Sequence, residues 1–306
     1  VLFRSEGYEE MARNHVIPYA DAHGWTIFVT REQLQTYINE KYEHGRLDGK
    51  GGLKPRSMKK HKNVLYQTLK LATLENVIPS NPAQFVTVPS IDPSPSQFLN
   101  KDEIDTLLAK GKEDPIYLIV KLTIVYGLRR SEVLGLQWDS IDFGSNMIYI
   151  KHTQVKKNKI HQKDRTKNRS SHRSFPLLKE IKTDFLNLKA QEEFNRKLCG
   201  KSYHDNPYLF KWEDGTPIRP DYLSRHFHVF LRNCGVRQIR FHDLRHSCAS
   251  FLLNSGFNLK DVSEWLGHSD ISVTADIYGH LDIQRKMKTA SAFEKAFLAD
   301  SDSSEE

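Results

Sequence analysis

The sequence predicts a mainly α-helical protein with a small antiparallel β-sheet, divided into two domains. Apolar residues recur at helical spacing through residues 1–88, and a proline-rich stretch then interrupts the chain at 89–97. The apolar period becomes strand-like only after Trp138. A chain of 306 residues is longer than one comfortable domain, so we expect two.

In the first domain, Thr30 and Gln33 form a capping-box pattern before a helix. Its apolar positions are Leu34, Tyr37, Ile38 and Tyr42. A glycine-rich basic loop covers 45–56. A second helix is predicted from about 57 to 75, basic early and apolar late, and prolines at 79 and 82 end it.

The second domain begins with another capping box, made by Asn100 and Glu103. A largely apolar helix over about 115–126 is expected to be buried. Residues 147–150 and 174–177 read as strands, with a basic segment between them. From Lys179 onward helices dominate again.

Charge and composition narrow the possible partners and location. The net charge is +7 and the pI about 9.1, which indicates an anionic partner. Three cysteines without CxxC spacing fit a reducing compartment and argue against a disulfide scaffold or a zinc finger. No membrane-spanning run or signal peptide is visible, so we expect a cytoplasmic protein with no membrane partner. The chain begins with valine, so we expect a piece of a longer protein.

Three short motifs carry residues suited to phosphate chemistry: Tyr126–Glu132 (YGLRRSE), His242–His246 (HDLRH), and Leu266–His268 (LGH), the last followed by Tyr278. Guanidinium groups present planar forks to phosphate oxygens and keep their protons near neutrality. A phenol can attack phosphorus and form an ester that preserves the bond energy, provided that a base assists it. Together these groups could cut a DNA strand without water.

In this order, the motifs resemble the tyrosine recombinase, or phage integrase, family, and most of all the integrases of conjugative transposons and phages of Gram-positive bacteria. The resemblance covers nearly the whole chain. It implies six catalytic residues: Arg129, Lys167, His242, Arg245, His268 and Tyr278. Asn168, after the lysine, departs from the threonine common there.

The resemblance also implies a role for each residue. Arg129 and Arg245 grip the scissile phosphate. His242 and His268 hydrogen-bond to the phosphate or the nucleophile, and His242 is a candidate acceptor of the tyrosine proton. Lys167 protonates the 5′ leaving oxygen, and Tyr278 becomes a 3′-phosphotyrosine. Glu132, one helical turn after Arg129, could orient active-site groups.

Taken singly, these residues leave alternatives open. Arg129 alone reads as a surface residue and has Arg130 as a competitor, Lys167 is one of many lysines in its segment, and Tyr278 could be a core tyrosine. The His242/His246 pair has the spacing of a zinc helix. It lacks the interposed glutamate and a third ligand, so we expect no metal.

Other basic residues are candidate contacts to DNA phosphates, which hold register without reading sequence. Four precede or begin the second helix: Arg56, Lys59, Lys60 and Lys62. A solvated helix face is an equal reading of these four. Six lie in the basic segment: Lys156, Lys157, Lys159, Lys163, Arg165 and Arg169.

The resemblance implies a helical core-binding domain (1–88), a linker (89–97) and a catalytic domain (98–282) that close as a clamp around duplex DNA. Residues 283–306 would form a helix and an acidic tail. An apolar stripe beginning at Ile283 either contacts a neighbouring protomer or packs on its own domain.

The implied function is integration and excision of a mobile element through a Holliday junction. Four protomers would act on two double-stranded DNA sites, the element ends and the target, with no cofactor and possible help from accessory DNA-bending proteins. The alternatives are a recombinase that resolves chromosome dimers, a type IB topoisomerase, and a DNA-binding regulator without catalysis.

Overall fold

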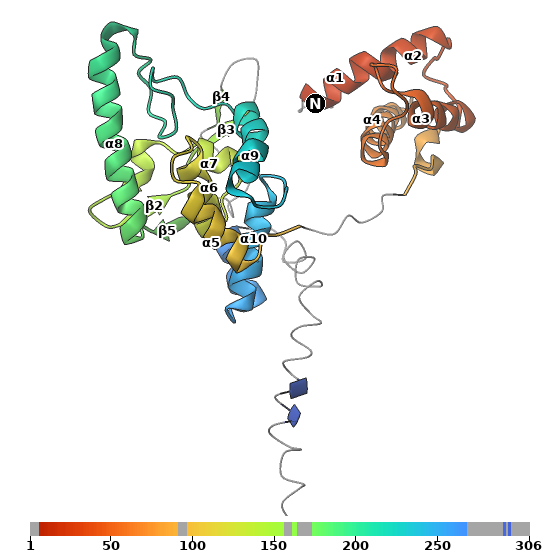
Figure 1. Ribbon diagram of the computed structural model, residues 1–306. Coiled ribbons are helices and arrows are strands. Elements are labelled where there is room, and N and C mark those ends of the chain that lie inside the picture. The colour runs from red at the N-terminus through yellow and green to blue at the C-terminus, as the bar shows by residue number, and fades with distance from the viewer. Residues whose placement is uncertain are drawn as a thin grey trace, which may run out of the picture. The chain divides into compact units, whose positions relative to one another are not determined.

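The computed structural model describes residues 6–90, 97–155, 161–163 and 173–267, with positions 290, 291, 293 and 294 (Figure 1). The chain forms two compact units, Val1–Ser94 and Pro95–Glu306, so the division lies inside the proline-rich segment. Within the described residues, no helix is both long and apolar enough to cross a membrane.

The first unit is helical. It contains α1 (Glu6–Met11), a π-helical turn (Ala12–Val16), α2 (Ile17–Ala22), α3 (Arg31–His44), α4 (Pro55–Leu74) and a 3-10 turn (Pro82–Phe85). The Thr30–Gln33 capping box is confirmed at the start of α3. Helix α4 begins two residues before the predicted start because Pro55, with its fixed φ, suits the first helical position.

Helices also dominate the second unit. They are α5 (Lys101–Lys110), α6 (Tyr117–Tyr126), α7 (Arg130–Leu134), α8 (Lys179–Cys199), α9 (Pro220–Cys234), α10 (Asp243–Asn254) and α11 (Leu259–Leu266), with 3-10 turns at Trp138–Ser140 and Gly200–Ser202. The predicted Asn100–Glu103 box caps α5. Helix α6 is apolar on nearly every side because it is buried at the centre of the unit, where α10 packs along it (Figure 1).

Two small antiparallel sheets complete this unit. The first has the order β1-β2-β5, with β1 (Ile141–Asp142), β2 (Met147–Tyr149) and β5 (Ser174–Pro176). The second is a hairpin of β3 (Thr153–Val155) and β4 (His161–Lys163). The mainly helical fold with a small antiparallel sheet is therefore confirmed. Strand β1, which sequence reasoning missed, has two residues, too few to show an alternating pattern.

Candidate active site

The turn between α6 and α7 places Arg129. Helix α6 ends at Gly127, whose φ of 61° is left-handed, and the chain then redirects so that Arg129 precedes the first turn of α7. The Arg129 backbone N–H donates to Oε2 of Glu132 at 2.8 Å, and its guanidinium Nη1 donates to Oε1 at 2.6 Å. One carboxylate thus fixes both the backbone and the side chain of Arg129.

Glu132 also binds Arg173, an arginine that sequence reasoning missed. The Glu132 side chain is 2 % exposed, and its Oε2 accepts from Nη2 of Arg173 at 2.8 Å. Arg173 lies just before β5 and is 8 % exposed, and its Nε and Nη1 have no partner within the described part of the chain. Sequence reasoning could not single out Arg173, because many other lysines and arginines directly precede it in the chain.

Arg245 on α10 is held by backbone carbonyls. It is 1 % exposed and donates to Gly127 O at 2.7 Å and to Leu266 O at 2.6 Å. Arg129 donates through Nη2 to Gly267 O at 2.9 Å. The two guanidiniums therefore occupy the C-terminal end of α11, where carbonyls lack helical partners and the dipole is negative.

The cluster carries excess positive charge. Three guanidiniums, on Arg129, Arg173 and Arg245, surround the single carboxylate of Glu132. Burial by itself raises the pKa of Glu132, but Arg173 and Arg129 outweigh it and hold this pKa below the usual value. Burial, with Arg129 and Arg173, lowers the pKa of Arg245 to about 9, so the group stays charged at neutral pH. Such a cluster suits an anion with several oxygens, such as a phosphodiester.

His242 stands at the start of α10, and its ring centroid lies 5.2 Å from that of His246 in a T-shaped arrangement. Desolvation by the surrounding groups, with His246 and Arg245, lowers the pKa of His242 to about 4. Its ring is therefore neutral near pH 7, and its unprotonated nitrogen can accept a hydrogen bond. Among the described residues no group of three His, Cys, Asp or Glu side chains could hold a metal ion.

A cleft of about 510 Å³ opens beside these residues. It is lined by Arg129, Arg130, Ser131, Ser224, His228, Arg240, Phe241 and His242. Arg130, the competitor of Arg129 in the sequence, is exposed and donates to Oγ of Ser224 on α9 instead of binding Glu132. The structure thus gives the two adjacent arginines different surroundings.

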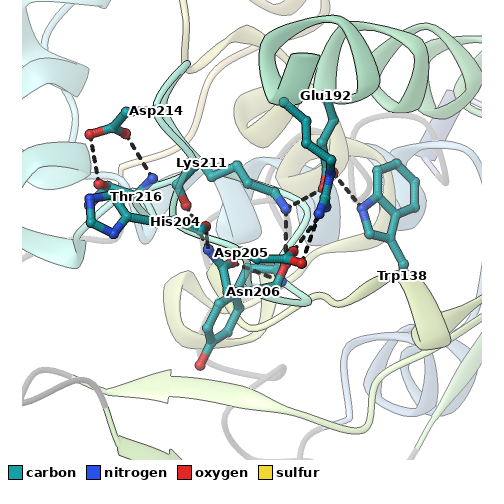
Figure 2. Close-up of polar contacts among 11 residues, drawn as sticks. Trp138, Glu192, His204, Asp205, Asn206, Lys211, Asp214 and Thr216 are labelled. Carbon is teal, nitrogen blue, oxygen red and sulfur yellow. Dashed lines mark hydrogen bonds and ion pairs between the residues drawn. The ribbon is translucent and has the colours of Figure 1, made fainter. Parts of the chain in front are cut away.

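A second cavity of about 680 Å³, beside α8, has the opposite charge. Its lining includes Glu113, Glu192, Glu213 and Asp214. Figure 2 shows Glu192 receiving hydrogen bonds from Nε1 of Trp138 at 2.7 Å and from Nζ of Lys211 at 2.6 Å. These bonds fasten α8 to the rest of the unit, and the acidic lining is unsuited to a DNA backbone.

The remaining predicted site residues divide into two groups. Arg56, Lys59 and Lys60 are exposed on α4, Lys62 is half-buried there, and Lys163 ends β4. The other positions lie outside the described residues: Lys156, Lys157, Lys159, Arg165, Lys167, Arg169, His268 and Tyr278. The structure therefore brings together Arg129, Glu132, His242 and Arg245.

The chain is similar in sequence to one known protein family and to several known recombinases. Residues 97–285 match the model of the "Phage integrase family". A XerC-like tyrosine recombinase of Caldanaerobacter subterraneus is 26% identical over 95% of this chain and 77% of the relative. The ICEBs1 integrase of Bacillus subtilis is 28% identical over 75% of this chain but only 63% of its own length.

Solved structures show the same fold. The Tn1549 transposon integrase, in complex with transposon right end DNA, superimposes with a TM-score of 0.70 and 19% sequence identity, covering 94% of this chain and 98% of that one. XerH recombinase bound to its difH substrate gives a TM-score of 0.58 with 18% identity, covering 92% of this chain and 79% of that one. The family match spans more than half of the sequence and contains the whole arginine cluster. The chain therefore belongs to the phage integrase family, the family of the tyrosine recombinases.

Proposed function

We propose that this protein is a site-specific DNA recombinase that integrates and excises a mobile element through a 3′-phosphotyrosine intermediate. The observation that carries the proposal is the buried arginine cluster, in which Arg129 and Arg245 are held rigidly by Glu132 and by the end of α11. Family membership and the similarity to the ICEBs1 integrase and the Tn916 transposase support it.

In the proposed mechanism, the two guanidiniums bind the non-bridging oxygens of the scissile phosphate and stabilise the charge that develops there. The Tyr278 oxygen attacks phosphorus, and His242, whose ring is neutral at pH 7, would accept the phenol proton. Lys167 protonates the departing 5′ oxygen, and His268 hydrogen-bonds the phosphate. Attack by the 5′ hydroxyl of a second strand reverses these steps, so no external energy source is needed.

The partner is double-stranded DNA, at the element ends and at the target site. The exposed basic residues at the start of α4 and those of the β3–β4 segment are proposed phosphate contacts. Four protomers would form the synaptic complex and pass through a Holliday junction, with accessory DNA-bending proteins as possible helpers. Residues 283–306 would supply the contact between protomers.

The test uses an element-end duplex with a nick near the cleavage site, so that the covalent adduct accumulates. Tyr278→Phe removes only the attacking oxygen, so DNA affinity should persist while the adduct disappears from a denaturing gel. Tyr222→Phe is the matched control. The centroid of the Tyr222 ring lies 4.7 Å from that of Trp212 and 5.0 Å from that of His226, and a phenylalanine ring would keep both contacts. The Tyr222→Phe variant should therefore form as much adduct as the wild type.

Two outcomes would contradict the proposal. One is an adduct that survives Tyr278→Phe or maps to another tyrosine. The other is a reaction that stops in EDTA and resumes with a divalent cation, because the arginines are proposed to act where other nucleases use a metal.

Similarity to a XerC-like tyrosine recombinase favours resolution of chromosome dimers as a second candidate. Cleavage of a chromosomal site in preference to element ends would identify it.

A further inference from the structure

The cleft beside the arginine cluster extends past the groups needed at the scissile phosphate. Besides Arg129 and His242, it is lined by two more guanidiniums, those of Arg130 and Arg240, and by the hydroxyls of Ser131 and Ser224. No carboxylate is among its lining residues in the described part of the chain. At about 510 Å³, the cleft has room for more than one phosphate group.

Arg240 is held in place by the carboxylate of Asp243. Its Nε and Nη2 donate to the two carboxylate oxygens of Asp243 at 3.0 and 2.8 Å, and its backbone N–H donates to the same carboxylate at 2.9 Å. Asp243 is 1 % exposed, whereas the Arg240 side chain is 69 % exposed. A buried anchor therefore orients a guanidinium whose Nη1 makes no hydrogen bond within the described residues, which lowers the entropy cost of binding an anion.

Arg130 reaches the same cleft from α7. Its Nη1 donates to Oγ of Ser224, and that hydroxyl donates in turn to the carbonyl of Pro220 at 2.9 Å. No carboxylate pairs with Arg130 in the described ranges, so its charge is not neutralised by a neighbour. Two oriented guanidiniums from different elements thus flank one basic cleft.

We propose that Arg130 and Arg240 form a second phosphate site, which holds a backbone phosphate flanking the scissile one on the same DNA strand. This inference rests on the proposed function, because it takes Arg129 and His242 as the walls shared with the reacting phosphate. The site contributes ground-state binding and register, because the proposed mechanism assigns neither arginine a role in the chemical step. Its ligand is a DNA phosphodiester.

The experiment measures affinity for a half-site duplex in which single phosphates near the cleavage position are replaced, one at a time, by neutral methylphosphonates. Arg130→Ala should weaken binding of unmodified DNA about tenfold, the loss of one charge-assisted contact. The substitution should also reduce the slope of log affinity against log salt concentration by about one, the change expected for the loss of one phosphate contact. At one flanking position the methylphosphonate should weaken wild-type binding about tenfold and leave Arg130→Ala nearly unaffected.

Arg240 needs a paired change, because its removal alone would leave Asp243 buried and unpaired. Arg240→Gln with Asp243→Asn neutralises both partners and should show the same insensitivity at the same position. Lys197→Ala is the control for total charge, because Lys197 is exposed on α8 outside the cleft.

The proposed second phosphate site is refuted if Arg130→Ala and the paired Arg240→Gln, Asp243→Asn variant bind unmodified DNA as tightly as the wild type. It is also overturned if every methylphosphonate weakens variants and wild type equally. These readings are independent of the covalent step, because binding is measured before cleavage. A wild-type protein that binds the duplex but forms no tyrosine adduct would refute the proposed function and still leave the binding comparison decisive.

Discussion

Glu132→Gln removes the only carboxylate among the three guanidiniums of the described cluster. The amide keeps the shape of the side chain but leaves buried positive charges uncompensated, which costs about 3–5 kcal/mol of stability when one partner of a buried pair is lost. In a unit of this size, that loss lowers Tm by about 6–20 °C. The control is Glu180→Gln, at an ion pair with Lys121 in which the Glu180 side chain is 86% exposed, and it should cost under about 1 kcal/mol.

The same variant makes a prediction about DNA. A bound phosphate brings negative charge back to the cluster, so a half-site duplex should raise Tm more in Glu132→Gln than in the wild type. Scanning calorimetry with and without the duplex measures both gains. An equal or smaller gain in the variant, or a Tm change no larger than that of Glu180→Gln, would refute the electrostatic reasoning.

Acid should erase the difference between the two proteins. The folded-state pKa of Glu132 lies below its usual value of 4.5, so the carboxylate stabilises the fold fully above that pH. The contribution is lost as pH falls through the lowered pKa. The stability gap between wild type and Glu132→Gln should therefore be complete near neutrality and shrink below pH 4.5. A gap that stays constant into acid would show that the loss is one of packing.

Three further predictions concern other parts of the site. Lys167→Ala should slow cleavage about 10²–10⁴-fold, and a 5′-bridging sulfur, which needs little protonation, should restore its rate far more than that of Arg129→Ala; equal recovery would make Lys167 a phosphate binder. Removing residues 283–306 should leave half-site binding unchanged in a gel-shift titration and abolish cooperative binding to a full site, unless this segment packs on its own domain. Gly127→Ala should cost about 1–3 kcal/mol more than Gly235→Ala in thermal unfolding. Both φ angles are positive, but only at 127 would the added Cβ meet a leucine methyl at 2.3 Å, whereas nothing lies within 4 Å at 235.

The sequence could predict the elements that have strong local signals. Helix α6 was visible as an apolar run and α3 and α5 by their capping boxes, because these signals depend on neighbours in the chain. The motifs also picked out Arg129, Glu132 and Arg245, which the structure brings together through direct contacts and mutual electrostatic effects.

Long-range partners were beyond such reasoning. Arg173 bonds Glu132 across 41 positions and looks, in the sequence, like its basic neighbours. The carbonyls of Gly127, Leu266 and Gly267 carry no side-chain signal, yet they orient both motif arginines. Backbone acceptors are available at every residue, so only the fold determines which ones an arginine meets.

The bonds that orient the arginines also set the order in which the site can form during synthesis. Arg129 reaches Gly267 over 138 positions, and Arg245 reaches Gly127 over 118. A chain emerging from the ribosome exposes its N-terminal side first, so α6 and the Arg129 turn, with its Glu132 contacts, emerge long before the carbonyls of Leu266 and Gly267. A polypeptide that ends before α11 therefore lacks the carbonyls of Leu266 and Gly267, and the two guanidiniums gain their full set of bonds only when α11 is complete.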